Sequence, residues 1–291
     1  MTLATILLVV LAALIHATWN LLAKRAALVG PAFVFAYNLV ACIAYAPWLV
    51  WILAHGRVAW TRHAVAAIVA SGVVHLAYSL VLQRGYQVAD FTVVYPVARG
   101  SGPMLASLAA VLLMGEAVTP LRLAGLLAIV AGILLISTRG DVRAFARPGG
   151  QAGVRWGAAT GGLIASYTVI DAFAVKALGV PPVVLDWFGN FQRFFFLVPF
   201  VARDPRRALA RMRGHWHLAV GVGLLAPLSY ILVLGALSLG APVTIVAPMR
   251  EMSMMAAAIM GMLFLREEVG PARLLGCAVL VGGVILLGAS G

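Results

Sequence analysis

The sequence predicts an all-α integral membrane protein of ten transmembrane helices, arranged as two inverted repeats of five helices each. Three observations carry this prediction: the composition, the length of the apolar runs, and a repeat with a constant spacing. Of the 291 residues, 63% are hydrophobic and 10% are charged, against about 45–50% and about 25% in soluble domains. The mean hydropathy of +1.04 agrees with this excess. We therefore expect a chain that lies largely within a lipid bilayer.

The apolar runs have the length of membrane-spanning helices. They extend over about 17–23 residues, and a helix needs ~20 residues to cross ~30 Å of hydrocarbon. They are too long for barrel strands and lack an alternation of period two. Pairs such as Gly30-Pro31, Thr119-Pro120 and Gly270-Pro271 separate the runs. We expect spanning helices near residues 3–23, 31–53, 64–83, 91–114, 120–138, 154–176, 182–201, 216–238, 243–265 and 271–288.

An internal repeat divides these helices five and five. A spacing of 152 residues pairs Tyr78 with Tyr230 and Pro96 with Pro248, and further pairs include Lys24/Lys176, Asn38/Asn190, His63/His215 and Glu116/Glu268. After Glu116 the spacing drops by one. Chance does not readily produce matches of Lys, Asn, His and Tyr in so apolar a chain. We expect a first repeat over 1–140, a linker over 141–152 and a second repeat over 153–291.

The topology follows from the odd number of helices in each half. After five crossings, the second half begins on the opposite side of the membrane. The halves are then inverted about a pseudo-two-fold axis in the membrane plane, an architecture common among secondary transporters. Fourteen Lys and Arg residues lie by the loops after odd-numbered helices and four by the other loops. The positive-inside rule therefore predicts that both termini lie outside.

The composition also restricts the partners. The net charge of +12 is spread mainly over short loops, which favours anchoring to anionic lipid head groups over binding of nucleic acid. Cys42 and Cys277 lie in apolar segments, so we expect no disulfide and no metal site. Nucleotide-binding, zinc and nucleophile motifs are absent from the sequence. We expect no cofactor and no enzymatic activity; a monomer and a homodimer both fit.

The central candidate segment is the fourth helix, in which Arg99 follows Tyr95 by one turn between Pro96 and Pro103. Charge at membrane depth favours a polar cavity, and proline frees a backbone carbonyl. We predict broken helices here and at the repeat-related ninth helix, with backbone groups that bind ligand. The alternative is a packing kink with Arg99 in a structural ion pair. We predict that Arg99 pairs with Glu251, which leaves Arg250 for a substrate carboxylate.

The seventh helix carries Asp186, Asn190 and Arg193 at positions i, i+4 and i+7. This spacing places the three side chains on one face, and a charged face within a membrane favours a cavity. We therefore count Asn190 and Arg193 among the residues expected to bind substrate. In the alternative, Asp186 lies at the membrane interface and Arg193 extends to the head groups.

Other polar residues within the spans complete the expected site. Trp19, Asn20, Tyr78 and Tyr230 are the remaining candidates for substrate binding. If protons drive transport, we expect Asp171, Glu251 or His16 to carry them, because a carboxylate at that depth is paired, protonated or solvated. A lone histidine such as His16 is more often a hydrogen-bonded packing residue than a proton relay. Lys24 and Lys176 end their helices, where we expect them to reach the head groups.

The motifs resemble the EamA family of the drug/metabolite transporter superfamily. The resemblance rests on Tyr95-Pro-Val-Ala-Arg99-Gly-Ser-Gly-Pro103 before Gly115-Glu116, and on Pro248-Met-Arg250-Glu251 before Leu265-Arg-Glu267-Glu268. It covers nearly the whole chain and implies a ten-helix carrier of the bacterial cytoplasmic (inner) membrane. Such carriers often export amino acids or related compounds through a central cavity. The family usually has cytoplasmic termini, opposite to the loop charges.

The expected function is therefore secondary transport of a small polar metabolite, with export as the expected direction. Transport would proceed by alternating access around a midplane cavity between the repeats. Proton coupling and passive facilitation fit the sequence equally well. One alternative is a flippase of lipids or lipid-linked compounds, or a membrane enzyme, that uses the same charged cavity. Another is a scaffold or sensor without transport activity.

Overall fold

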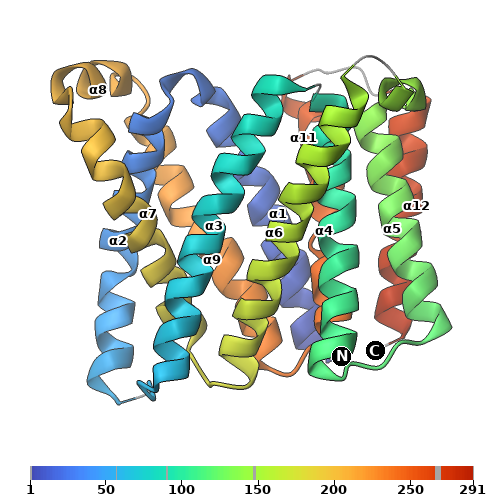
Figure 1. Ribbon diagram of the computed structural model, residues 1–291, viewed down its shortest axis with the longest axis horizontal. Coiled ribbons are helices and arrows are strands. Elements are labelled where there is room, and N and C mark those ends of the chain that lie inside the picture. Colours follow the sequence, from blue (N-terminus) through green and yellow to red (C-terminus); the bar gives the residue numbers. More distant parts are fainter. Residues whose placement is uncertain (1, 57, 90, 147–148, 266–269, 291) are drawn as a thin grey trace.

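The computed structural model describes residues 2–56, 58–89, 91–146, 149–265 and 270–290, which form helices without strands. Figure 1 shows one bundle of long helices that run up and down, with both termini at the same end. The helices are α1 Leu3–Arg25, α2 Pro31–Ala54, α3 Arg62–Val88, α4 Phe91–Met114, α5 Pro120–Thr138, α6 Gly150–Lys176, α7 Pro182–Ala202, α8 Pro205–Met212, α9 Trp216–Ser238, α10 Val243–Met249, α11 Met252–Leu265 and α12 Pro271–Ala289.

The described helices lie at the positions of the predicted spans, with a few differences. Nine segments of the described chain are long and apolar enough to cross a membrane, so the protein is a multi-pass membrane protein. The helix α7, which carries Asp186 and Arg193, is not among the nine. The predicted ninth helix is divided into α10 and α11, and the short helix α8 was not predicted.

Threonine and proline residues set the starts of several helices. The Thr61 hydroxyl accepts a hydrogen bond from the backbone N–H of Ala64 at 3.1 Å, and Thr119 accepts one from Arg122 at 3.2 Å. Each satisfies one of the backbone donors that a helix leaves unpaired in its first turn. Proline occupies the first turn of further helices, where its missing N–H is not needed; these are α2, α5, α7, α8 and α12.

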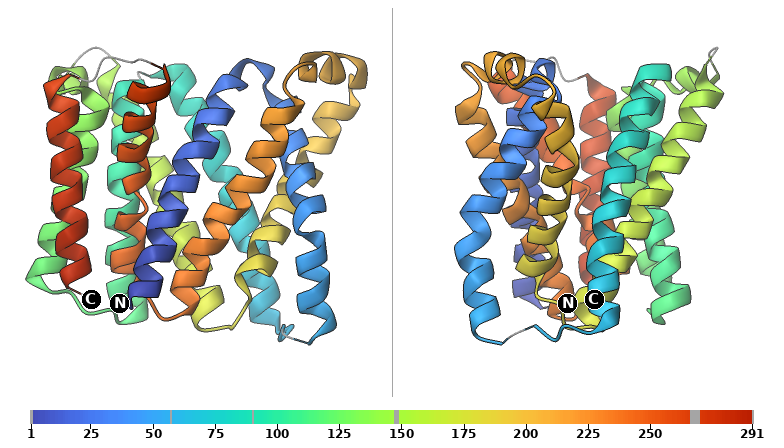
Figure 2. Two further views of the ribbon diagram at one scale, coloured as in Figure 1. Left: turned by 180° about the vertical axis from the view of Figure 1, so that it is seen from behind. Right: turned by 60° about the vertical axis from the view of Figure 1, so that its left-hand side comes forward.

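Glycine residues bring α5 and α12 into direct backbone contact. A Cβ atom added at Gly125 would lie 2.9 Å from the carbonyl oxygen of Gly283, and one at Gly132 would lie 2.8 Å from that of Gly276. As the α5 position advances by seven, the α12 position retreats by seven. The two helices are therefore antiparallel, as Figure 2 also shows. Small residues allow such close approach between membrane helices.

A second glycine strip joins α6 to α4. A Cβ atom at Gly153 would lie 2.7 Å from Val93, and one at Gly157 would lie 2.9 Å from the carbonyl oxygen of Val94. The strip therefore serves close packing of α4 against α6, the ordinary role of such residues.

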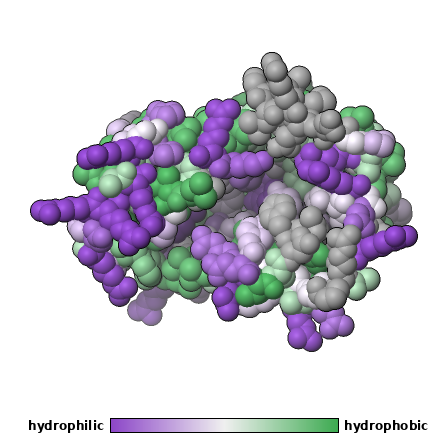
Figure 3. All heavy atoms as spheres, turned by 90° about the horizontal axis from the view of Figure 1, so that it is seen from above, coloured by the Kyte–Doolittle hydropathy of each residue, from purple (hydrophilic) through white to green (hydrophobic). Residues whose placement is uncertain are grey.

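The end of the bundle opposite the termini is basic. It holds α8, whose arginines Arg206, Arg207 and Arg211 are exposed. Figure 3 shows this face from above, with hydrophilic side chains around its rim and a hollow near its centre. The loops predicted to hold most of the positive charge thus lie at one end, and both chain termini lie at the other.

Candidate functional site

An ion pair between Arg99 and Glu251 lies at the centre of the candidate site. Arg99 is in the middle of α4, and Glu251 is in the turn between α10 and α11. The Arg99 Nε atom lies 2.8 Å from Glu251 Oε2, and Arg99 Nη2 donates a hydrogen bond to the Ser253 hydroxyl at 3.4 Å. The two residues are 9% and 1% exposed. The predicted pairing between the two repeats is confirmed.

The backbone around this pair differs from the prediction of two broken helices. The helix α4 is continuous from Phe91 to Met114 despite its two prolines, so the predicted break there is wrong. The break in the second repeat is present. Beyond Met249 the hydrogen bonds shorten to three residues, from Glu251 N–H to the Pro248 carbonyl at 3.0 Å and from Met254 N–H to the Glu251 carbonyl at 2.9 Å. Of the two segments that contain Arg99 and Glu251, the second is the one whose described backbone leaves the α-helical hydrogen-bond pattern.

Arg250 lies beside the ion pair and contacts aromatic rings. Its Nη2 atom donates a hydrogen bond to the Tyr167 hydroxyl at 3.3 Å, and its guanidinium carbon lies 5.9 Å from the ring centroid of Tyr167. Tyr78 on α3 meets the same ring edge-on, with centroids 5.7 Å apart. Arginine favours such planar and anionic partners. Arg250 is buried, yet its Nε atom has no hydrogen-bond partner among the described residues.

Asp171, His75 and Tyr230 form a second polar cluster next to Tyr167. The Tyr230 hydroxyl on α9 donates a hydrogen bond to Asp171 Oδ2 on α6, and His75 Nε2 on α3 lies 4.0 Å from the same oxygen. The His75 ring stacks on Tyr167 with centroids 4.0 Å apart. Asp171 and Tyr230 were predicted site residues, and Tyr167 and His75 lie in the same cluster.

The polar face of α7 is assembled as its spacing predicts. The Asn190 side-chain amide donates to Asp186 Oδ2 at 2.8 Å, and Arg193 Nη2 donates to Asn190 Oδ1 at 3.0 Å. Asp186 and Asn190 are 6% and 5% exposed. Asp186 is therefore buried within the bundle, and its predicted place in a polar cavity stays a prediction.

Only some of the predicted site residues on α1 and α4 lie near the Arg99–Glu251 ion pair. His16 and Trp19 pack edge to face with centroids 4.8 Å apart, and His16 lies within electrostatic range of Arg99 and Arg250. Tyr95 interacts with Arg99, one turn further along α4. Asn20, by contrast, is exposed and donates to the His16 carbonyl of its own helix at 2.8 Å. The geometry does not join Asn20 to the ion pair.

Several buried polar atoms near this site have no hydrogen-bond partner among the described residues. They are Trp19 Nε1, Thr168 Oγ1, Asp171 Oδ1, Arg250 Nε and Glu251 Oε1. Buried polar groups are nearly always hydrogen-bonded, because an unpaired one costs about 1–3 kcal/mol. Donors and acceptors of both charges are therefore available here to a polar ligand or to water.

Glu116 forms a network that sequence reasoning missed. It lies after α4 and accepts hydrogen bonds from the N–H groups of Val243 and Thr244 at 2.8 and 2.9 Å, where α10 begins. The Lys176 ammonium donates to Glu116 Oε1 at 3.1 Å and to the Ala241 carbonyl at 3.2 Å. The expectation that Lys176 reaches the head groups is thus wrong. The repeat partner Glu268 lies outside the described residues.

The network also sets the titration of Glu116. Burial alone would raise the pKa of this carboxyl, but the hydrogen bonds from Thr244, Val243 and Lys176 outweigh it and lower the pKa below its ordinary value. The ionised form is the one that accepts all of these donors. The signal in the sequence was the matched pair Glu116/Glu268, which had no assigned role.

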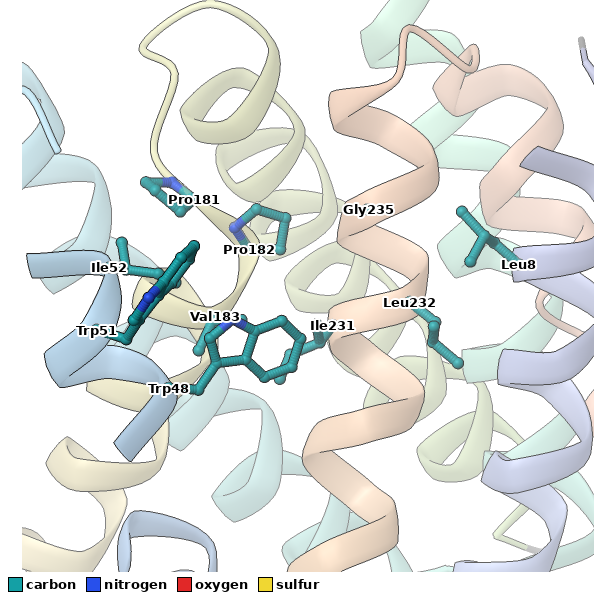
Figure 4. A pocket seen from close by; sticks show the side chains of 10 residues that line it. All are labelled: Leu8, Trp48, Trp51, Ile52, Pro181, Pro182, Val183, Ile231, Leu232 and Gly235. Carbon is teal, nitrogen blue, oxygen red and sulfur yellow. The ribbon is translucent and has the colours of Figure 1, made fainter. Parts of the chain in front are cut away.

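An apolar pocket lies apart from these charges, near the terminal end of the bundle. It has a volume of about 490 Å³ and lies between the ends of α2 and α9 and the start of α7, as Figure 4 shows. Trp48, Trp51 and Pro182 line it together with Ile231 and Leu232. Both tryptophans are about half exposed, at 44% and 45%. Its lining has no charged side chain to orient a polar ligand.

Comparisons with known proteins agree with this architecture. The model of the EamA-like transporter family matches residues 3–138 and 151–289. A solved structure titled "Crystal structure of protein" superposes with a TM-score of 0.75 at 18% sequence identity, and the match covers 99% of each chain. At that identity, the likeness shows a shared fold. No curated protein matches the chain.

Proposed function

Because the chain belongs to the EamA-like transporter family, within the drug/metabolite transporter superfamily, we propose that it is a secondary transporter of a small polar metabolite. The observation that carries the proposal is the buried charged site between the repeats, with its unpaired polar atoms. The free-energy cost of burying these polar atoms is offset if a polar solute supplies their missing hydrogen-bond partners. The solute would be held at mid-membrane and released to either side.

The chemistry of the site favours an amino acid or a related compound. We propose that Arg250 binds the carboxylate, since it has a donor to spare and no carboxylate bound to it in the described structure. Glu251 Oε1 is an acceptor suited to an ammonium group. Around them we propose Arg99, Tyr95, Tyr78, Tyr230 and Trp19, with Asn190 and Arg193 at the edge of the site.

Alternating access between two inverted repeats is the mechanism that we propose. The antiparallel α5–α12 pair supports it, because each of its two glycine contacts becomes the other when the repeats are exchanged. Arg99 and Glu251 occupy equivalent positions in the two repeats, as expected for a site near the pseudo-two-fold axis. Ten spanning helices, with α10 and α11 counted as one and the short α8 left out, would complete the arrangement. The Glu116–Lys176 network would close the terminal end while the basic end is hollowed.

We further propose a place in the bacterial cytoplasmic membrane, with export as the direction. Applied to the loop charges, the positive-inside rule favours a cytoplasmic basic end and external termini. A C-terminal reporter fusion that is active only in the cytoplasm tests this orientation. The flippase alternative has less support, because the lateral pocket near Trp48 offers no charge for a head group.

The test of the function is a panel of amino acids and related metabolites in proteoliposomes that contain the full-length protein. We expect uptake or counterflow of at least one of them, and a fall of at least tenfold in Arg250→Gln. The matched control is Arg206→Gln on the exposed surface of α8, which should transport like the wild type. Absence of flux across the panel, or equal flux in Arg250→Gln, would overturn the proposal.

A further inference from the structure

We propose that His75 and Asp171 form the proton-binding couple of this protein, a site distinct from the Arg99–Glu251 pair. One proton binds between the His75 Nε2 atom and the Asp171 Oδ2 atom, and it arrives from and returns to water without any change in bonding elsewhere. The role of the couple in transport rests on the proposed function. Its ability to bind a proton does not.

The first argument is the hydrogen bonding of the His75 ring. Its Nδ1 atom lies 2.9 Å from the carbonyl oxygen of Ser71. A carbonyl oxygen only accepts, so Nδ1 carries the hydrogen in this geometry. In the neutral ring, Nε2 then has a lone pair, and this atom is the one that faces Asp171 Oδ2 across 4.0 Å. Two acceptors facing each other repel, whereas one proton on either of them makes the contact favourable.

The second argument is the burial of Asp171. Its exposed fraction is 0%, its Oδ2 atom accepts from Tyr230, and its Oδ1 atom has no partner among the described residues. Neutral hydroxyl donors, here those of Tyr230 and Ser71, do not compensate an ionised carboxylate at this depth. Asp171 therefore needs either a proton or a cation in contact. His75 supplies the second option when it is protonated, so the couple as a whole retains the proton.

Two of the cationic groups around the couple already have partners of their own. Arg99 is held by Glu251, and Arg193 is linked to Asp186 through Asn190. The polar and charged groups around Asp171 come from its own helix and from the helices packed against it. They are Ser71 and His75 on α3, Tyr167 and Thr168 on α6, Asp186 and Arg193 on α7, Tyr230 on α9 and Arg250 after α10. The charged residue of α4 is Arg99.

A chain of contacts connects the couple to the proposed substrate site. Arg250 donates to the Tyr167 hydroxyl, and the Tyr167 ring stacks on His75. A carboxylate that binds Arg250 changes the partner of Tyr167 and thereby the surroundings of His75. By linkage, a proton on the couple changes substrate affinity by the same factor as substrate changes proton affinity. This reciprocity makes the couple a site of energy coupling.

The direct test measures proton binding in the purified full-length protein in liposomes, without substrate. Infrared difference spectra between acidic and alkaline pH should contain a carboxylic-acid band that is lost in Asp171→Asn and retained in Asp186→Asn. His75→Gln should move the pH at which the band appears by at least one unit, and Tyr230→Phe should shift its frequency. A band that is lost in Asp186→Asn instead, or that is insensitive to His75→Gln, would overturn the proposal. If Asp171→Asn does not fold, Asp171→Glu and His75→Gln provide the same comparison.

A second test uses whichever solute the metabolite panel identifies. In the wild type, an imposed pH gradient should accelerate flux relative to exchange at equal pH. In Asp171→Asn this acceleration, divided by the exchange rate of the same variant, should fall at least tenfold. If the pH gradient still accelerates flux in Asp171→Asn, the proposed role of the His75–Asp171 couple is wrong and the proposed transport function stands. If the Asp171 band titrates but the protein transports no solute, the proposed transport function is wrong and the proposed proton binding stands.

Discussion

The helix α4 and the segment α10–α11 occupy equivalent places in the two repeats, yet only the second is broken. Each contains a proline at the same repeat position, Pro96 and Pro248, and each carries an arginine near the middle. Nevertheless α4 continues through Arg99, whereas α10 ends at Met249. A proline alone therefore does not decide whether the helix breaks here.

The packing partners of the two segments differ more than the segments themselves. Helix α4 lies on the glycine strip of α6, where Gly157 and Gly161 meet its backbone and the Ser101 side chain. The segment α10–α11 packs on α1, in which the repeat-related positions are Thr5 and Val9. These larger side chains are buried, at 2% and 0% exposure. We infer that the close, flat contact with α6 holds α4 straight, and that α1 offers no such surface.

The largest effect is expected from the ion pair that joins the two segments. Arg99→Gln leaves Glu251 buried without its partner, and removing one member of a buried pair costs about 3–5 kcal/mol. Thermal unfolding in detergent should show this loss, and transport should cease. The double reversal Arg99→Glu with Glu251→Arg should recover part of both. If the double variant is no more stable and no more active than the single variants, the Arg99–Glu251 ion pair does not stabilise the contact between the two segments.

The glycine strip should give the next largest effect. In Gly157→Leu the new side chain would meet Val97 and the Val94 carbonyl within 2.9 Å, and such overpacking costs about 1–3 kcal/mol. The matched control is Gly162→Leu on the same helix, where a Cβ atom meets nothing within 4 Å. Unfolding midpoints compare the two. Equal midpoints would contradict the role assigned to the strip.

A smaller effect is expected from the cap on α10. Glu116→Gln removes the charge that holds the Val243 and Thr244 N–H groups, and lost caps cost about 0.5–2 kcal/mol. Because folding lowers the pKa of Glu116, its contribution is complete above the ordinary value of 4.5 and is lost as the pH falls through the lower folded value. Wild-type and variant midpoints should therefore differ at pH 7 and converge in acid. A difference that persists unchanged in acid would argue against this account.

The smallest effect is expected from Pro248→Ala. Since Pro96 occupies an unbroken helix, restoring the N–H at 248 should leave the break in place. Hydrogen exchange of the amides near Arg250 should match that of the wild type. Slower exchange there would show that the proline, rather than the packing against α1, causes the break.

The site was predictable where the signal was periodic or symmetric. Asp186, Asn190 and Arg193 share a face because their spacing requires it, and Arg99 meets Glu251 because the repeat places them at equivalent positions. Contacts between distant helices gave no such signal. His75 reaches Asp171 across 96 positions in the chain, and Lys176 reaches Glu116 across 60, so only the folded bundle brings them together.

The sequence by itself determined the membrane class, the positions of the spanning segments and the repeat. These follow from local properties, since a run of apolar residues has one stable conformation in lipid, in which its backbone hydrogen bonds are satisfied internally. Only the tertiary structure decided that α4 stays straight, that Glu116 caps α10 and that His75 faces Asp171. Those outcomes depend on which face of each helix packs against which neighbour, and on how closely the side chains of the two fit together. Such fit is a property of the assembled bundle and not of any one segment.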